Sequence, residues 1–131
     1  MGDSTFVADW LEKALKDLKA AKILFEHDCG NEVVAFHCQQ AAEKALKALI
    51  LYYYSTLESG HSLIYLCKKL LEKAEEFSDK LKDCAFLNQY YLETRYPNEN
   101  QIIVTNEEAL ECMKIAEDIL NIVNEKTNRG N

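Results

Sequence analysis

Apolar residues near the start of the chain recur at alternating steps of four and three. This spacing puts them along one side of an α-helix, and they are Val7, Leu11, Ala14, Leu18, Ala21 and Phe25. The lysines of the same segment fall largely on its other sides and indicate a solvated face. We therefore expect a first helix that is capped by Ser4 or Thr5 and ends at about His27.

A second helix is predicted from about Asn31 to Tyr54, after Gly30 stops the first. Its apolar residues cover nearly half of the circumference at about 100° per residue. They are Val34, Cys38, Ala41, Ala42, Ala45, Leu46, Ala48, Leu49, Tyr52 and Tyr53. A helix with so wide an apolar arc is expected at the centre of its bundle, where its alanines let neighbouring helices approach closely.

The rest of the chain predicts shorter helices followed by one long helix. Ser62 or His61 caps a third helix, and Ser78 caps a fourth that runs from Asp79 to about Thr94. Thr105 with Glu108 three residues later forms a capping box for the last helix. That helix carries a second apolar seam, consisting of Ala109, Met113, Ala116, Leu120 and Val123.

Composition agrees with one all-α domain of about four or five helices covering residues 1–131. The chain has one Pro and four Gly, which suits long helices, and its 48% of hydrophobic residues is usual for a globular protein. The net charge is −7, with 15 Lys and Arg against 22 Asp and Glu. A general nucleic-acid binder carries a basic excess, so we expect no general nucleic-acid binding and only local contacts with phosphate.

Targeting signals and cysteines indicate a cytoplasmic protein. The first ten residues lack a basic region followed by an apolar stretch, and the longest apolar run, Ala48 to Tyr54, is too short to span a membrane. The five cysteines form no CxxC pair, which favours buried thiols in a reducing compartment. We predict neither a metal site nor a resident cofactor.

Two segments are candidates for function. A polar stripe of His37, Gln40, Lys44 and Lys47 lies beside the apolar arc of the second helix. It is either the solvent edge of that helix or a groove wall that meets a phosphate or an acidic partner. The second segment, Tyr90 to Pro97, places three tyrosines and Arg95 at a helix end. Either Arg95 caps that helix while the tyrosines pack in the core, or this loop carries function.

The same segments resemble landmarks of a known family. Residues 36–49, FHCQQAAEKALKAL, look like the second-helix signature of the HEPN family. Gly60-His61-Ser62-Leu63 resembles its next landmark, and Tyr91 to Pro97, with Thr94-Arg95-Tyr96-Pro97 intact, resembles the third. The resemblance covers about residues 5–126 and implies an up-and-down four-helix bundle with an extra short helix.

HEPN resemblance also implies a choice of functions. One group of HEPN domains cleaves RNA in a dimer, using Arg followed by four to six residues and then His; another partners a minimal nucleotidyltransferase, often as a toxin–antitoxin pair. Here the positions where that His would fall are Asn100, Gln101 and Ile102. All three histidines, His27, His37 and His61, precede Arg95. The departure removes the acid–base residue of the RNA-cleaving group and favours a domain that is not an enzyme.

We therefore interpret the chain first as a non-catalytic HEPN binding module. It would take a nucleotide-like ligand, a minimal nucleotidyltransferase partner, or both, and form a homodimer. A ribonuclease with a relocated active site and a purely structural helical interaction protein are the alternatives. The residues predicted to bind a nucleotide or its phosphate are Lys44, Lys47, His61, Tyr91, Arg95 and Tyr96, with His37 and Gln40 completing the polar stripe.

Overall fold

The computed structural model describes residues 2–93 and 103–128, and within these ranges all regular structure is helical. The helices are α1 (Gly2–Glu26), α2 (Asn31–Tyr54), α3 (Leu63–Leu70), α4 (Leu81–Asn88), α5 (Tyr90–Glu93) and α6 (Asn106–Thr127), with a 3₁₀ helix, η1 (Glu75–Lys80), before α4. The predicted all-α class is confirmed, and the second helix has the predicted bounds.

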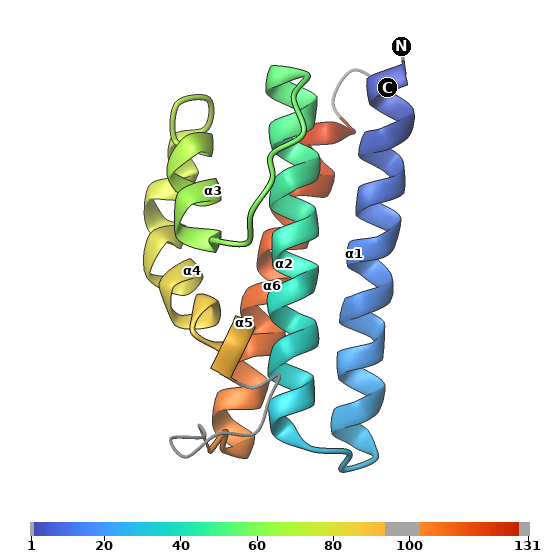
Figure 1. Ribbon diagram of the computed structural model, residues 1–131, viewed down its shortest axis with the longest axis vertical. Helices are drawn as coiled ribbons and strands as arrows, with labels where there is room; N and C mark the ends of the chain where they lie inside the picture. Colours follow the sequence, from blue (N-terminus) through green and yellow to red (C-terminus); the bar gives the residue numbers. More distant parts are fainter. Residues whose placement is uncertain (1, 94–102, 129–131) are drawn as a thin grey trace.

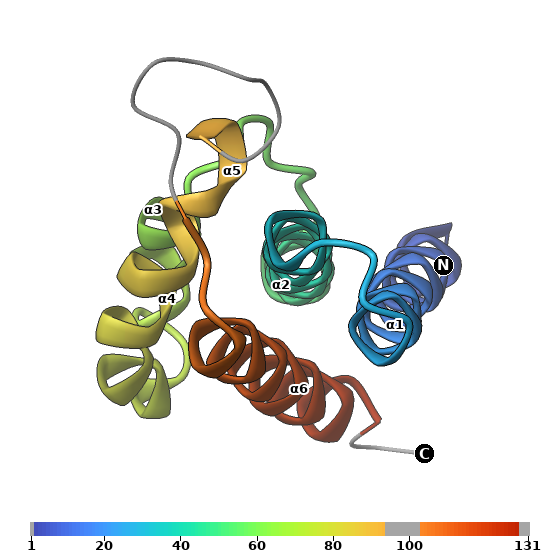
Figure 2. The same cartoon turned by 90° about the horizontal axis from the view of Figure 1, so that it is seen from below.

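The helices form an up-and-down bundle. In Figure 1, α1 runs downward, α2 upward, η1 and α4 downward, and α6 upward, with the short α3 as an addition beside α4. Seen along its axis in Figure 2, α2 lies between α1, α6 and the group of shorter helices. It packs against α1, α3, α4, α5 and α6. The central position predicted for this helix is therefore confirmed.

The two apolar seams meet inside the bundle. In α1, Val7, Ala14, Leu18 and Ala21 are buried, and in α6 all five residues of the predicted seam are buried. The capping box at the start of α6 is also confirmed, since Thr105 Oγ1 accepts from Glu108 N at 3.1 Å and Glu108 Oε1 accepts from Thr105 N at 3.0 Å. No helix within the described ranges is both long and apolar enough to cross a membrane.

Two predicted helix starts were wrong. Helix α1 begins at Gly2, so Ser4 and Thr5 lie inside it. Ser78 lies inside η1, and the predicted fourth helix is divided into η1, α4 and α5. The interruption after Asn88 coincides with polar side chains that bond to backbone groups: Asn88 Oδ1 accepts from Leu63 N at 2.7 Å, and Gln89 Nε2 donates to Phe86 O at 2.8 Å. Such bonds compete with the regular helical ladder.

The connection between α2 and α3 positions the candidate site. Helix α2 ends where Ser55 takes a left-handed conformation with φ 55°, and residues 55–62 then return alongside α2 (Figure 1). Ser62 caps α3, because its Oγ accepts from Tyr65 N at 3.1 Å, as predicted. The return brings His61, the residue before this cap, back beside the middle of α2.

Candidate functional site

Glu43 is the centre of a polar cluster on the buried side of α2. Its Oε2 accepts from Lys47 Nζ at 2.9 Å and lies 2.9 Å from His61 Nδ1. Its Oε1 accepts from Gln39 Nε2 at 3.3 Å. Glu43, Gln39 and Lys47 are buried, although two of them carry charge. We call Gln39, Glu43, Lys47 and His61 the Glu43 cluster.

The geometry of His61 defines its tautomer. An ionised carboxylate can only accept a hydrogen bond, so the Nδ1 atom facing Glu43 carries a proton. The His61 side chain is 52% exposed, and its Nε2 has no hydrogen-bond partner among the described residues. The imidazole is thus held at one nitrogen and open at the other.

An aromatic group lies against this imidazole. The ring of Tyr91, from α5, stacks on His61 with centroids 4.5 Å apart and an angle of 17° between the planes. Phe36 of α2 lies 6.4 Å from the Tyr91 ring, at 33°. Residues of α2, of the 55–62 connection that follows it, and of α5 therefore build one aromatic surface next to the Glu43 cluster.

Gln39 holds the cluster from the interior. Its Nε2 donates to Glu43 Oε1 and to the backbone oxygen of His61, at 3.3 and 3.4 Å. The reverse orientation of the amide would point oxygen at two acceptors, so this assignment follows from the contacts. Gln39 Oε1 is buried without a hydrogen-bond partner in the described part of the chain. A buried unpaired acceptor costs about 1–3 kcal/mol, which is unusual for a group that serves packing alone.

The polar stripe divides into two sets of contacts. Lys44 Nζ binds Asp17 Oδ2 of α1 at 2.6 Å, and His37 Nδ1 lies 3.4 Å from Asp17 Oδ1. Lys47 instead belongs to the Glu43 cluster, while Gln40 is half-buried. The stripe is therefore neither a plain solvent edge nor a single row of free cations, because both lysines are paired with carboxylates.

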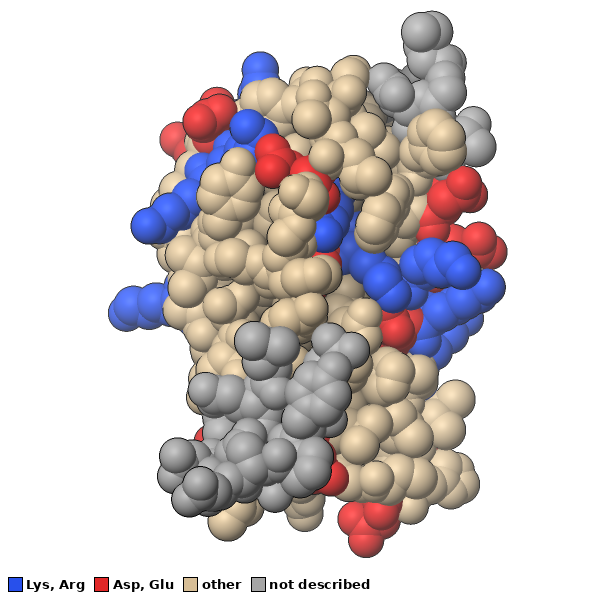
Figure 3. All heavy atoms as spheres, in the orientation of Figure 1, with Lys and Arg blue, Asp and Glu red and all other residues tan. Residues whose placement is uncertain are grey.

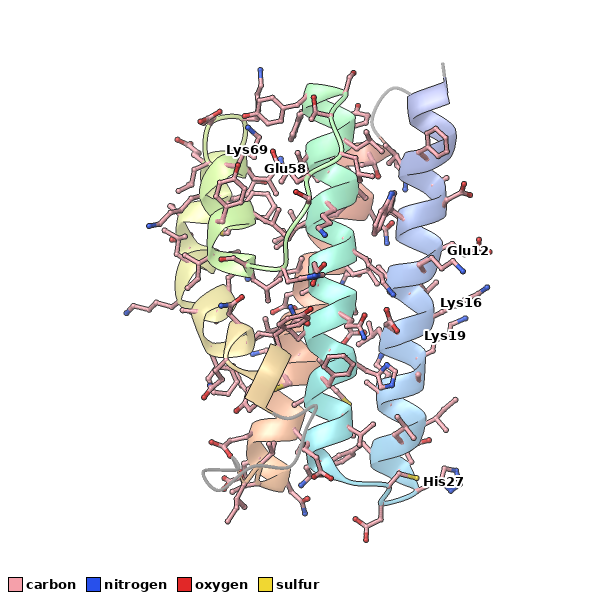
Figure 4. The ribbon with its side chains drawn as sticks, in the orientation of Figure 1. Glu12, Lys16, Lys19, His27, Glu58 and Lys69 are labelled. Carbon is pink, nitrogen blue, oxygen red and sulfur yellow. The ribbon has the colours of Figure 1, made fainter. Side chains whose placement is uncertain are left out.

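A hollow opens beside the cluster, between α1 and α2. It measures about 440 Å³ and is lined by Asp9, Trp10, Lys13 and Lys44. Lys47 Nζ lies 5.9 Å from the centroid of the Trp10 ring, within the range of a cation–π contact. Figure 3 shows further basic side chains gathered over the middle of α1, where Figure 4 labels Lys16 and Lys19. Basic and acidic side chains therefore lie together on this face, with Asp9 in the lining of the hollow and Asp17 bound to Lys44.

His61 lies just before α3, and the backbone N–H groups at a helix N-terminus can bind an anion. Two of those groups already have partners within the protein. Leu63 N donates to Asn88 Oδ1 at 2.7 Å, and Tyr65 N donates to Ser62 Oγ at 3.1 Å. These two N–H groups are therefore not available to a phosphate at this helix end. His61 makes its described contacts with its imidazole and its carbonyl oxygen.

Of the six predicted binding residues, three come together in the structure: Lys47, His61 and Tyr91. Lys44 contacts a different carboxylate. Arg95 and Tyr96 lie outside the described residues, so their part in the site stays a prediction. Sequence reasoning missed Glu43 and Gln39. The available signal was an acidic residue of the central helix, four residues before a lysine and next to the polar stripe.

The comparison with protein families decides the identity of the fold. The model of the HEPN domain family matches residues 7–126. The chain belongs to the HEPN domain family. The four residues of the Glu43 cluster lie in two segments that resemble HEPN landmarks, residues 36–49 and 60–63. Both segments are inside the matched range.

Solved HEPN-like structures and a curated relative agree with this placement. The crystal structure of TT1696 from Thermus thermophilus is 34% identical, with a TM-score of 0.81 over 92% of this chain and 97% of that one. The archaeal HEPN homologue ST0689 is 30% identical, with a TM-score of 0.76 over 93% of this chain and 98% of that one. A Methanocaldococcus jannaschii protein named "Putative toxin MJ1304" is 28% identical over 127 residues, 87% of this chain and 83% of its own length.

Proposed function

We propose that this HEPN domain binds a nucleotide-like ligand at the aromatic surface of His61 and Tyr91. The observation that carries the proposal is the stacked pair itself, at 4.5 Å, with His61 fixed by Glu43 and partly exposed. Aromatic faces of this kind stack on nucleobases, which contributes roughly 1–3 kcal/mol per base. His61 Nε2 adds a hydrogen-bonding atom at the edge of the same surface.

The charges around the site favour recognition of the base over recognition of phosphate by lysine. Lys44 and Lys47 are each neutralised by a carboxylate, so neither offers a free positive charge. Arg95 and Tyr96 follow Tyr91 closely in sequence. We include both in the proposed site, Arg95 as a planar fork for phosphate oxygens and Tyr96 as a further stacking ring.

The Glu43–Lys47 pair also supports a functional cluster. Replacing a buried ion pair by apolar residues of similar volume is often neutral or even stabilising, so stability alone is a weak reason for this one. We propose that the role of these two buried charges is to hold His61 in place. The same carboxylate oxygen serves Lys47 and His61, which ties the orientation of the imidazole to the ion pair.

The expected biological setting is a toxin–antitoxin type pair. The support is the similarity to the M. jannaschii protein named as a toxin. In this proposal the HEPN chain is a homodimer and its partner is a minimal nucleotidyltransferase. Expression of the chain alone should slow growth of a bacterial host, and co-expression of an adjacent nucleotidyltransferase frame should relieve it. Normal growth at an equal level of folded protein would contradict this setting.

Ligand binding is tested by calorimetric titration of ATP and GTP into the wild type and Tyr91→Leu. We expect the variant to bind more than about tenfold more weakly, a loss of about 1.4 kcal/mol. The matched control is Lys16→Ala, an exposed residue that points away from the bundle in Figure 4. It should bind within about twofold of the wild type. Absence of binding by the wild type, or equal binding by Tyr91→Leu, would contradict the proposed site.

A further inference from the structure

We propose that the hollow between α1 and α2 binds a free aromatic α-amino acid, a zwitterion with an apolar ring. The hollow of about 440 Å³ is lined by Asp9, Trp10, Lys13 and Lys44. A space of this size lies within the range of small-molecule sites, which combine an apolar surface with a few polar groups. It shares no residue with the nucleotide site proposed above, so binding here does not depend on that site.

Trp10 supplies the apolar surface of the hollow. Its side chain is partly buried and packs against the hydrophobic core, so the indole is fixed in position. Lys47 is buried, and its Nζ lies 5.9 Å from the centroid of the Trp10 ring, so this cation–π contact comes from the interior. Aromatic rings attract one another beyond the burial of their area. An indole in the lining therefore favours a ligand with an aromatic ring.

Two unpaired charges of opposite sign accompany the indole. Lys13 and Asp9 are both exposed, and neither forms an ion pair within residues 2–93 and 103–128. They lie one turn apart on α1, where residues four apart share one face of the helix. A zwitterion that places its carboxylate at Lys13 and its ammonium at Asp9 gives both charges a partner.

Lys44 adds a hydrogen-bond donor from the opposite wall, on α2. Its Nζ is bound to Asp17 Oδ2 at 2.6 Å, and this contact holds the ammonium in place. An ammonium has three donors, so the bond to Asp17 leaves others for the carboxylate of a ligand. Because Asp17 neutralises Lys44, the wall gains a donor without gaining a net charge.

This balance of charges separates the proposed ligand from a nucleotide. A triphosphate would bring several negative charges to a hollow where Lys13 is the one unpaired cation of the lining and Asp9 repels anions. A simple anion or a simple cation would match one of the two charges and leave the other without a partner. An α-amino acid carries one charge of each sign and matches both.

The experiment compares three probes that differ by one charged group. They are 4-fluorophenylalanine, 3-(4-fluorophenyl)propionate, which lacks the ammonium, and 4-fluorophenethylamine, which lacks the carboxylate. Binding to the full chain is followed by fluorine NMR of the probe, while the one Trp of the chain gives a single indole N–H signal that reports contact at the hollow. We expect 4-fluorophenylalanine to shift that signal and to bind about two- to fivefold more tightly than either truncated probe, the usual effect of an exposed ion pair.

Variants of the exposed charges test the assignment without disturbing the core. Lys13→Gln should bind 4-fluorophenylalanine no more tightly than 4-fluorophenethylamine, because the carboxylate has lost its partner. Asp9→Asn should bind it no more tightly than 3-(4-fluorophenyl)propionate, because the ammonium has lost its own. Trp10→Leu should weaken all three probes. The matched control is Lys16→Gln, which points away from the bundle in Figure 4 and should keep the wild-type affinity within about twofold.

Absence of binding by the wild type at millimolar 4-fluorophenylalanine would overturn the inference, and so would equal binding of the three probes. Wild-type preferences that persist in Lys13→Gln and Asp9→Asn would overturn it as well. Tyr91→Leu keeps the test separate from the nucleotide site, because this variant should bind 4-fluorophenylalanine as the wild type does even where it no longer binds ATP. Loss of the amino acid in Tyr91→Leu would place it on the aromatic surface of His61 and Tyr91 instead of in the hollow.

Discussion

Glu43 and Lys47 form an ion pair one turn apart on α2, with side chains only 9% and 7% exposed. Removing two charges from water costs several kcal/mol per ion, and their attraction repays this only when the geometry is good and the remaining groups are hydrogen-bonded. The contacts from His61 and Gln39 supply such bonds to the carboxylate. Each of these two buried charges is therefore stabilised by the other, and neither is expected to be stable in the core alone.

Removing only the lysine should expose this dependence. Lys47→Met leaves the buried carboxylate without its cation, and we expect a loss of about 3–5 kcal/mol in the free energy of unfolding, measured by urea denaturation. The double variant Glu43→Gln with Lys47→Met should recover much of that loss, because no buried charge remains.

The control for this pair is Lys22, which binds Glu117 at 3.1 Å with both side chains about half exposed. Lys22→Met should change stability by less than about 1 kcal/mol, as for other exposed pairs. Equal effects of Lys47→Met and Lys22→Met would show that Glu43 is well solvated without Lys47.

Packing between α1 and the rest of the bundle can be tested on one helix. Leu18 is 3% exposed, whereas Leu15 is 42% exposed. Leu18→Ala should lower the free energy of unfolding by roughly 2–5 kcal/mol through lost burial and a residual cavity. Leu15→Ala should stay within about 0.5 kcal/mol of the wild type. Similar losses at both positions would mean that α1 is rotated relative to its observed face.

The sequence was most informative where structure depends on local interactions. The bounds of α2 and the Thr105–Glu108 capping box follow from neighbouring residues and were predicted correctly. Ser78 does not cap a helix, because the 3₁₀ helix η1 already begins at Glu75. The segment that follows is bonded to α3 through Asn88. A contact between segments 25 residues apart in sequence leaves no periodic signal.

The candidate site also depends on contacts between distant segments, which the sequence pattern did not predict. Lys44 and Lys47 lie one turn apart and were predicted to act together, yet they bind Asp17 and Glu43. Which carboxylate each lysine meets depends on how α1 and the 55–62 connection lie against α2. The partnership of His61 with Glu43 likewise depends on the return of that connection along α2, which residue types and spacing do not encode.

Alkaline pH should destabilise the fold through a buried thiol. Burial, with smaller contributions from Glu108 and Glu111, raises the pKa of Cys112 from 9.0 to about 12. Between these values the unfolded chain loses this proton and the folded chain keeps it, so stability falls as pH rises from about 9 towards 12. The contribution is at most about 1.4 kcal/mol per pH unit for one thiol.

This effect is measured by urea unfolding at about pH 8 and about pH 10. Burial also raises the pKa of Cys38 above its usual range, so both thiols act in the same direction. Cys112→Ala should therefore show a smaller drop in stability between the two conditions than the wild type. Cys29→Ala, at an exposed position, should show the full drop. An unchanged drop in Cys112→Ala would remove this thiol as a cause.

Arg95 provides the remaining test of the ligand site. It is one of only two arginines in a chain of net charge −7, and its guanidinium suits phosphate oxygens better than the paired lysines do. Arg95→Ala should weaken the binding of ATP and GTP by more than about tenfold in a calorimetric titration, a loss of about 1.4 kcal/mol. Lys19→Ala removes an equal charge from the exposed side of α1 (Figure 4) and should leave affinity within about twofold. If Arg95→Ala binds as the wild type does while Tyr91→Leu is weakened, the ligand is held by its base alone. Arg95 then has the role of a cap for helix carbonyls, and its loss should lower the urea midpoint instead.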